Sequence, residues 1–308
     1  MMEVLESLTR SLTHVVRGQG DAARLLLVGF LAGGHVLVED VPGVGKTTLA
    51  KALARSLQLD FSRVQCTPDL LPTDILGANV LDPRDGSLSF HHGPVFTQIL
   101  LVDETNRASP RTQSGLLEAM NERQVTVDGV SHPLPDPFFV VATQNPVDFH
   151  GTYPLPFAQL DRFLLRLSLG YPDEDQELEV LYARKDTDPL DAVRPVAGAQ
   201  VIAELKASVR RVAVSQDVGR YLLRLVRATR GHRDLELGVS PRGALALFRA
   251  SQALAMMNRR EFVLPDDVQQ LTEPVLAHRL LLTSAARYGG RTEAAILREI
   301  LESVDVPA

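Results

Sequence analysis

The stretch from residue 36 to residue 53 constrains the fold of this chain more than any other. Residues 36–38 are an apolar run that predicts a buried strand, and residues 40–45 predict a loop that contains Gly43 and Gly45. From Lys46 onward the pattern predicts a helix. A buried strand, a glycine-containing loop and a helix in this order are typical of an α/β fold with a parallel sheet.

The start of this helix is a place where an anion is expected. Backbone N–H groups in a first helical turn are unpaired and carry positive partial charge, and Lys46 adds a cation. A phosphate resolves this arrangement, because the loop can wrap it, Lys46 can reach the β- and γ-phosphates, and Thr47 can offer a hydroxyl to Mg²⁺. The alternative is an ordinary turn with a surface lysine, which the flanking strand and helix disfavour. The predicted nucleotide-binding residues are Pro42, Gly43, Val44, Gly45, Lys46, Thr47 and Thr48.

The first residue of this loop departs from the usual pattern. The motif G-x-x-x-x-G-K-[ST] places a glycine at position 40, where this chain has Asp40. Aspartate tolerates the left-handed backbone region better than most residues, so the loop can still form. A carboxylate beside phosphates weakens binding unless it points away. From sequence, Asp40→Gly is therefore predicted to leave the affinity for ATP equal or tighter.

Two more apolar runs end in polar side chains. Residues 98–102 precede Asp103 and Glu104, and residues 138–142 lead to Asn145. Ligands of α/β sheets bind at the carboxyl ends of the strands, where these side chains should meet. Asp103 is predicted to hold Mg²⁺ through water, Glu104 to polarise the water that attacks the γ-phosphate, and Asn145 to orient that water. The alternatives are a solvated acidic turn and an ordinary turn asparagine.

Two hairpins are predicted around Asp-Gly turns, at residues 79–90 and 125–134, with irregular surface loops as the alternative. His91 and His92 are adjacent and should point opposite ways on an extended chain, which argues against a metal site. Beyond residue 172 the chain predicts helices, so a domain boundary is expected near residue 170, with domains at 1–170 and 171–308. The helices are expected near 179–184, 200–210, 216–229, 240–257 and 265–282.

Arg242 lies where a helix is predicted to begin. Ser240 is a suitable N-cap and Pro241 a suitable first helical residue, which places Arg242 in the first turn. A cation there is disfavoured by the helix dipole, and an anion would relieve this. Arg242 is therefore expected to reach the nucleotide from the second domain, in one cleft with Lys46, Asp103 and Asn145. The alternative is a surface arginine.

Composition excludes several classes of protein. The net charge of −6 provides no basic field for nucleic acid. One cysteine, Cys66, excludes an internal disulfide and suits a reducing cytoplasm. The N-terminus has no signal-peptide pattern, and the apolar run at 25–32 is too short to span a bilayer. A cytoplasmic protein without a membrane span is expected.

These motifs resemble, over nearly the whole chain, the MoxR family of AAA+ ATPases. The resemblance depends on residues 41–47, 65–74, 103–108, 142–146, 151–156, 159–163 and 240–242. It implies an AAA+ P-loop NTPase domain, with a parallel sheet flanked by helices, then a smaller all-helical lid domain. It also implies a ring, commonly a hexamer, with ATP between subunits. Lys46 and Thr47 correspond to Walker A, Asp103 and Glu104 to Walker B, Asn145 to sensor 1 and Arg242 to sensor 2. Arg162 resembles the arginine finger that enters the neighbouring subunit's site, and Arg107 is the competing candidate.

The resemblance implies ATP hydrolysis with Mg²⁺ and a chaperone that matures or activates other protein complexes. Metal-cofactor insertion is one such activity, often with a partner that carries a von Willebrand factor A domain. The two hairpins are the expected client-binding surfaces. Phe157 stands where the family normally has glutamate, which affects the expected subunit contacts near the finger.

Three alternatives remain. A DNA-acting AAA+ motor would need a basic pore, yet residues 125–134 contain no Lys or Arg. A magnesium-chelatase-like subunit would carry long inserts. A P-loop kinase is disfavoured because Glu104 with a trans arginine favours water as the acceptor.

Overall fold

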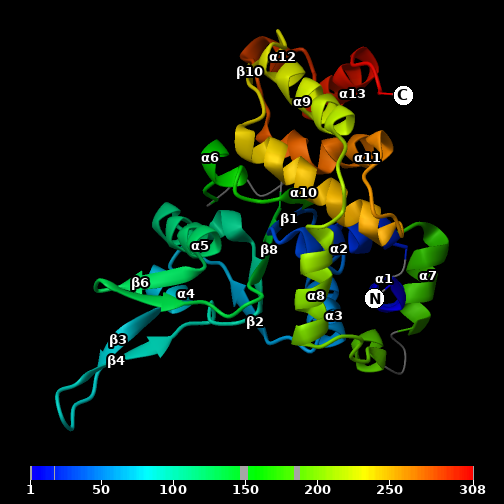
Figure 1. Cartoon of the computed structure of the whole chain (residues 1–308). Helices are drawn as coiled ribbons and strands as arrows, with labels where there is room; N and C mark the ends of the chain where they lie inside the picture. Colours follow the sequence, from blue (N-terminus) through cyan, green and yellow to red (C-terminus); the bar gives the residue numbers. More distant parts are fainter. Residues whose placement is uncertain (1, 17, 146–151, 184–187, 308) are drawn as a thin grey trace.

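The computed structural model describes residues 2–16, 18–145, 152–183 and 188–307 (Figure 1). Parts of the sequence predictions lie outside these ranges, namely Pro146 and Gly151 of the family motifs and the predicted helix end at Arg184.

Five parallel strands form the central sheet, in the order β2-β5-β8-β1-β9. They are β1 (Val36–Glu39), β2 (Phe61–Gln65), β5 (Ile99–Asp103), β8 (Phe139–Gln144) and β9 (Leu165–Leu167). Because every pairing is parallel, all carboxyl ends lie at one edge, called here the C-terminal edge, and all amino ends lie at the N-terminal edge. The predicted α/β fold with a parallel sheet is confirmed.

Both faces of the sheet are covered, which explains why its strands are continuous apolar runs. Alternate residues of a strand point to opposite faces. In β1, Val36 and Val38 join the core beneath helices α1 (Met2–Val15), α2 (Gly20–Ala32) and α3 (Lys46–Ser56). Leu37 joins the opposite core, which α5 (Pro110–Glu122) covers (Figure 1).

The two predicted hairpins are confirmed and project together to one side of the sheet (Figure 1). The first pairs β3 (Gly77–Leu81) with β4 (Leu88–His92) and follows the short helix α4 (Pro72–Leu76). The second pairs β6 (Gln124–Val127) with β7 (Val130–Pro133). Its turn residues Asp128 and Gly129 both have positive φ, as a two-residue hairpin turn requires.

The hairpins contact each other. The ring of Phe90 stacks on that of His132 with 3.9 Å between centroids. Asn79 Nδ2 donates to Asp128 Oδ2 at 2.6 Å. An aromatic stack and a polar contact therefore hold the two hairpins as one projection.

The C-terminal part is mainly helical, as predicted. Its helices are α6 (Phe157–Leu160), α7 (Glu174–Ala183), α8 (Ala199–Val209), α9 (Gln216–Arg230), α10 (Pro241–Met257), α11 (Pro265–Leu276), α12 (Ser284–Tyr288) and α13 (Glu293–Ser303). Several details differ from the prediction: α7 begins at Glu174 rather than near residue 179, and α12 and α13 were not predicted. The helix expected over 265–282 ends at Leu276, and a two-stranded antiparallel ladder joins β10 (Leu235–Leu237) to β11 (Leu281–Leu282).

One apolar core runs from the first helices into the C-terminal helices. Leu26 of α2 and Leu247 of α10 are both fully buried in it. The division at residue 170 stays a prediction. Within the ranges given above, none of the helices combines the length and the apolar character that a bilayer span needs.

Candidate functional site

The predicted phosphate loop joins β1 to α3 at the C-terminal edge. Gly43 has φ +89° and Gly45 has φ +102°, a region that favours glycine. Gly45 is the N-cap of α3 and, as a glycine, has no side chain with which to cap this helix start. Pro42 and Gly43 are exposed, whereas Val44 to Thr48 are half-buried. The loop therefore presents backbone N–H groups and the Thr47 and Thr48 hydroxyls at an open helix start, as phosphate binding requires.

Lys46 lies among the carboxylates that the sequence predicted would meet it. Burial lowers the pKa of its ammonium, whereas the charges of Asp103, Asp40 and Glu104 oppose this shift. Its Nζ donates to the carbonyl oxygen of Asp40 at 2.8 Å. The structure thus brings the glycine loop and the tip of β5 together; the catalytic roles of these residues stay predictions.

A buried threonine positions both acids of β5. Thr143 Oγ1 donates to Asp103 Oδ1 at 2.6 Å and accepts from the backbone N of Glu104 at 2.9 Å. Glu104 has φ +56°, a strained conformation for a residue other than glycine. Sequence analysis missed this role of Thr143. The available signal was a polar residue at the end of an apolar strand, next to the one that carries the acids.

The carboxylates have basic partners in the same chain. Arg63 pairs with Asp103 Oδ2 at 2.8 Å, and Arg107 pairs with Glu104 at 2.9 Å. All these side chains are partly exposed, so a nucleotide and its metal can compete for the carboxylates. The structure places Arg107 at its own cleft beside Glu104, which disfavours it as a finger for a neighbouring subunit.

Asn145 also lies at the C-terminal edge. It follows β8, which pairs with both β5 and β1, and it is 8% exposed. Asn106, which follows β5, donates through Nδ2 to the carbonyl oxygen of Asn145 at 3.4 Å. Asn145 therefore lies at the sheet edge that carries the acids, while its place in the nucleotide cleft and its water-orienting role stay predictions.

Asp40 uses both carboxylate oxygens as hydrogen-bond acceptors, and its Oδ1 accepts from Val41 N of the loop at 2.9 Å. Its Oδ2 accepts from Leu169 N at 2.6 Å, Gly170 N at 2.8 Å and Ser168 Oγ at 3.0 Å. The carboxylate therefore fixes the end of β9 to the start of the loop. Gln19 adds to this junction, because its Nε2 contacts the carbonyl oxygens of Val44 at 3.2 Å and Gly170 at 3.3 Å. The prediction for Asp40→Gly did not foresee these hydrogen bonds, which glycine would remove, and its effect on ATP affinity stays a prediction.

Arg162 lies at the N-terminal edge of the sheet. It precedes β9, whose first residue Leu165 pairs with Val36 at the start of β1. Leu164 N donates to the carbonyl oxygen of His35 at 2.8 Å, so the residues just before β9 lie next to the residue just before β1. Arg162 therefore lies across the sheet from its own phosphate loop. Phe157, the other departure from the family pattern, is the half-buried first residue of α6 shortly before it.

Arg242 does not lie in the cleft with Lys46, Asp103 and Asn145, so the prediction of one shared cleft was wrong. Ser240, the N-cap of α10, donates to Asp161 at 2.9 Å, which places the start of α10 at the N-terminal edge. At its other end, Asn258 accepts a hydrogen bond from Arg24 of α2.

The physical reason is the direction of α10, which packs against α2 in the opposite orientation. A helix of 17 residues separates its ends by about 25 Å. Arg242, two residues after Ser240, therefore lies near the segment that carries Asp161 and Arg162, at the sheet edge opposite the phosphate loop.

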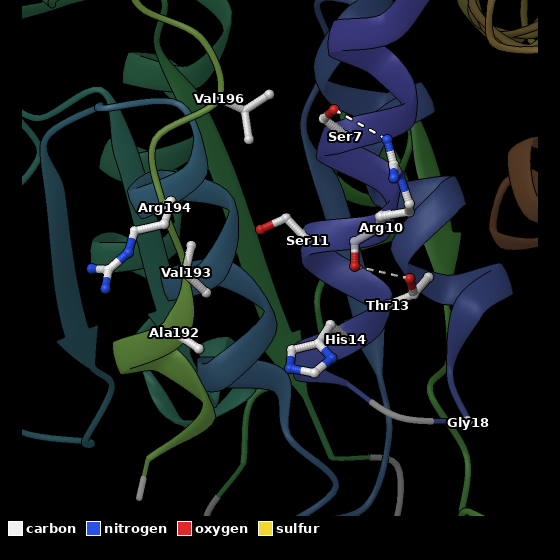
Figure 2. A pocket seen from close by; sticks show the side chains of 10 residues that line it. All are labelled: Ser7, Arg10, Ser11, Thr13, His14, Gly18, Ala192, Val193, Arg194 and Val196. Atoms are coloured by element: carbon white, nitrogen blue, oxygen red, sulfur yellow. Dashed lines mark hydrogen bonds between the residues drawn. The ribbon is translucent and has the colours of Figure 1, made fainter.

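A separate cavity lies on α1. It has a volume of about 810 Å³ and opens between α1 and the segment that follows a 3₁₀ helix at Pro189–Ala192. In Figure 2, Ser11 and His14 project from α1 toward this segment, whereas the guanidinium of Arg194 extends away. Neither the acids of β5 nor residues 40–48 line this cavity, so it is distinct from the cleft around Lys46.

A glycine loop at a helix start, with two acids at the tip of another strand at the same sheet edge, defines a P-loop nucleotide site on an AAA-type fold. The family described as "ATPase family associated with various cellular activities (AAA)" matches residues 35–165, and the AAA lid domain matches residues 227–300. A crystal structure of a candidate ATPase from Cytophaga hutchinsonii aligns with a TM-score of 0.92 and 36% identity, covering 100% of this chain and 96% of that one.

Curated relatives show which family of AAA-type ATPases this chain resembles. YeaC of Bacillus subtilis, itself uncharacterized, is 47% identical over 296 residues, which are 96% of this chain and 92% of YeaC. The chaperone MoxR1 of Mycobacterium tuberculosis is 37% identical over 315 residues, covering 99% of this chain and 83% of MoxR1. This chain belongs to the MoxR family of AAA+ ATPases, as the resemblance implied.

Proposed function

We propose that this chain hydrolyses ATP to ADP and phosphate within a ring of identical subunits, commonly a hexamer, and acts as a chaperone for partner protein complexes. One observation carries this proposal. The groups that suit nucleotide binding gather at the C-terminal edge, whereas the two candidate charge-stabilising arginines lie at the N-terminal edge of the same chain. A site that is complete only with a neighbour's arginines calls for a head-to-tail ring.

In the proposed cleft, the loop and the first turn of α3 bind the triphosphate. Lys46 leaves the Asp40 carbonyl and contacts the β- and γ-phosphates. Glu104, oriented by Thr143, accepts a proton from the attacking water, and Asn145 holds that water. Thr47 and Asp103 supply the hard oxygen ligands that suit Mg²⁺, which when bound neutralises phosphate charge.

From the neighbouring subunit, Arg162 and Arg242 approach the γ-phosphate. Arginine neutralises the charge that spreads over the equatorial oxygens of the transferred phosphoryl group. Arg242 is exposed and Arg162 half-buried. Within the described ranges neither forms an ion pair, which leaves both cations available to an anion from outside the chain.

The paired hairpins are the proposed client surface. Val80, Leu81, Leu88 and Val130 are exposed apolar side chains of this projection. The printed name of MoxR1 supports a chaperone role. Maturation or activation of a complex, including metal-cofactor insertion, and a von Willebrand factor A partner are parts of the same proposal, as is a cytoplasmic location.

The test compares wild type with Glu104→Gln, which keeps the shape of the side chain. Loss of a positioned base lowers hydrolysis by roughly 10²–10⁴-fold, while ATP binding is retained. Phosphate release measures turnover, and a fluorescent ATP analogue measures affinity. Light scattering with ATP should report a ring. Wild-type turnover in Glu104→Gln would exclude Glu104 as the base, and a monomer active at every concentration would exclude the ring.

A further inference from the structure

We propose that Asp161, Arg279 and Ser240 form a latch that holds Arg162 and Arg242 as one rigid unit, so that both arginines reach the neighbour's nucleotide together. The three are positioning residues, because they act through the two arginines rather than on the nucleotide. This inference rests on the proposed function, since it assumes that the arginines act between subunits.

Arg279 binds the segment that carries Arg162. It is 1% exposed, and its Nε donates to Asp161 Oδ1 at 2.9 Å. Its Nη1 donates to the carbonyl oxygen of Leu164 at 3.0 Å, and its Nη2 donates to that of Phe163. The guanidinium thus contacts residues on both sides of Arg162, which restricts the backbone there.

Ser240 joins this segment to the helix that carries Arg242. Its Oγ donates to Asp161 Oδ2 at 2.9 Å and accepts from Gly243 N at 3.1 Å, as an N-cap does. The Asp161 carboxylate therefore contacts both Arg279 and the cap of α10. Asp161 immediately precedes Arg162, and Ser240 lies two residues before Arg242.

The first turn of α10 packs directly on Arg279. A Cβ added to Gly243 would lie 2.8 Å from Arg279 Cδ and 2.6 Å from Val239 Cγ1, closer than side chains allow. Burial lowers the pKa of Arg279 to about 10, the charge of Asp161 opposes this, and the charge of Arg242 adds to the lowering. Arg242 therefore lies near enough to Arg279 for their charges to interact.

The latch is far from the phosphate loop of its own chain. An experiment can therefore separate its effect on turnover from its effect on ATP affinity. Loosening it should lower turnover in the neighbour's site and leave ATP affinity in its own site unchanged. A purely structural ion pair predicts no such separation.

The test uses Ser240→Ala, because it removes the hydroxyl that bonds Asp161 and Gly243 N and keeps the ion pair of Asp161 and Arg279. Loss of a hydrogen bond to a charged group should lower kcat by about tenfold, with the Kd of a fluorescent ATP analogue changed by less than about twofold. Ser240→Thr, which keeps the hydroxyl, should restore kcat. The matched control is Ser251→Ala on the same helix, where a buried hydroxyl bonds only Leu247 O among described contacts. It should stay near wild type.

Mixing two variants distinguishes a positioning role from a purely structural one, because only a positioning role predicts that turnover is restored in mixed rings. Ser240→Ala has an intact cleft, so Lys46→Ala subunits, which supply an intact latch, should restore its turnover in mixed rings. Asp161→Asn should behave likewise if it folds. Unchanged kcat in Ser240→Ala, or a loss that mixing does not rescue, would overturn the latch.

The failure of the latch and that of the proposed function are distinguishable. If Arg162→Ala and Arg242→Ala are rescued by Lys46→Ala but Ser240→Ala is not, only the latch is wrong. If neither arginine variant is rescued, the intersubunit function is wrong and the latch falls with it.

Discussion

The two edges of the central sheet differ in how their charged groups are satisfied. At the C-terminal edge, Lys46 bonds a backbone carbonyl, and Glu104 pairs with a partly exposed Arg107. At the N-terminal edge, the buried Arg279 is paired with Asp161. At the C-terminal edge, a ligand can therefore replace the partners of Lys46 and Glu104, as a site that exchanges ligands requires. At the N-terminal edge, the buried ion pair is satisfied within the chain, and Arg162 and Arg242 stay available to another subunit.

The largest expected effect comes from the outward arginines. Arg162→Ala should lower kcat by roughly 10³-fold, because a trans arginine stabilises charge that develops in the transition state. Phosphate release measures this loss, and ATP affinity should change little because Lys46 is unaltered. Arg107→Ala is the comparison. A much larger loss in Arg107→Ala than in Arg162→Ala would make Arg107 the finger and reverse the assignment.

The N-terminal edge should also be the more sensitive to acid. His35 is buried there, its Nδ1 accepts from Val140 N at 3.0 Å, and burial lowers its pKa to about 4. The unfolded chain binds a proton near pH 6.5 and the folded chain only near pH 4, so stability present above pH 6.5 is lost as the pH falls to 4. The His35 share of that loss is about 3 kcal/mol.

The check is urea unfolding of wild type and His35→Gln at pH 7.5 and pH 4. The variant should lose less free energy of unfolding on acidification, by about 3 kcal/mol. His278, also buried at this edge with a lowered pKa, remains in both proteins and acts as an internal control. An equal loss in both proteins would show that His35 is not the acid-sensitive group.

At the C-terminal edge, Asp40 should matter for stability rather than for repulsion of phosphate. Asp40→Asn keeps the volume but weakens charge-assisted bonds to Leu169 and Gly170, at a cost of about 2 kcal/mol in the free energy of unfolding. Asp40→Gly should lose at least as much and also weaken ATP binding, contrary to the expectation from sequence. Calorimetry and a binding titration measure both. Unchanged stability with tighter ATP binding would support the earlier expectation.

The sequence predicted the parts of this molecule that follow from local pattern. Apolar runs predicted the three central strands β1, β5 and β8, and Asp-Gly pairs predicted both hairpins. The rule that ligands bind at carboxyl ends predicted that Asp103 would lie near Lys46. Thr143 was missed because its two hydrogen bonds join residues far apart in the chain.

The placement of Arg242 could not be predicted for a related reason. The dipole argument predicts that an anion suits the start of α10, but the direction of α10 on α2 decides which nucleotide it can meet. That direction depends on nonlocal contacts, including Arg24 with Asn258 and Ser240 with Asp161. The helix predicted over 265–282 also ends early, at Leu276, and beyond that end Arg279 makes a nonlocal contact with Asp161.

The most direct test of the two-edge account mixes Arg242→Ala with Lys46→Ala and measures ATP turnover across mixing ratios. Arg242→Ala keeps a sound cleft, and Lys46→Ala keeps a sound N-terminal edge, so mixed rings should be active although each protein alone is not. A mixture of Arg242→Ala with Arg162→Ala should stay inactive, because both lesions lie on the same edge. Activity in the second mixture and none in the first would mean that Arg242 serves the nucleotide of its own chain, which contradicts the account.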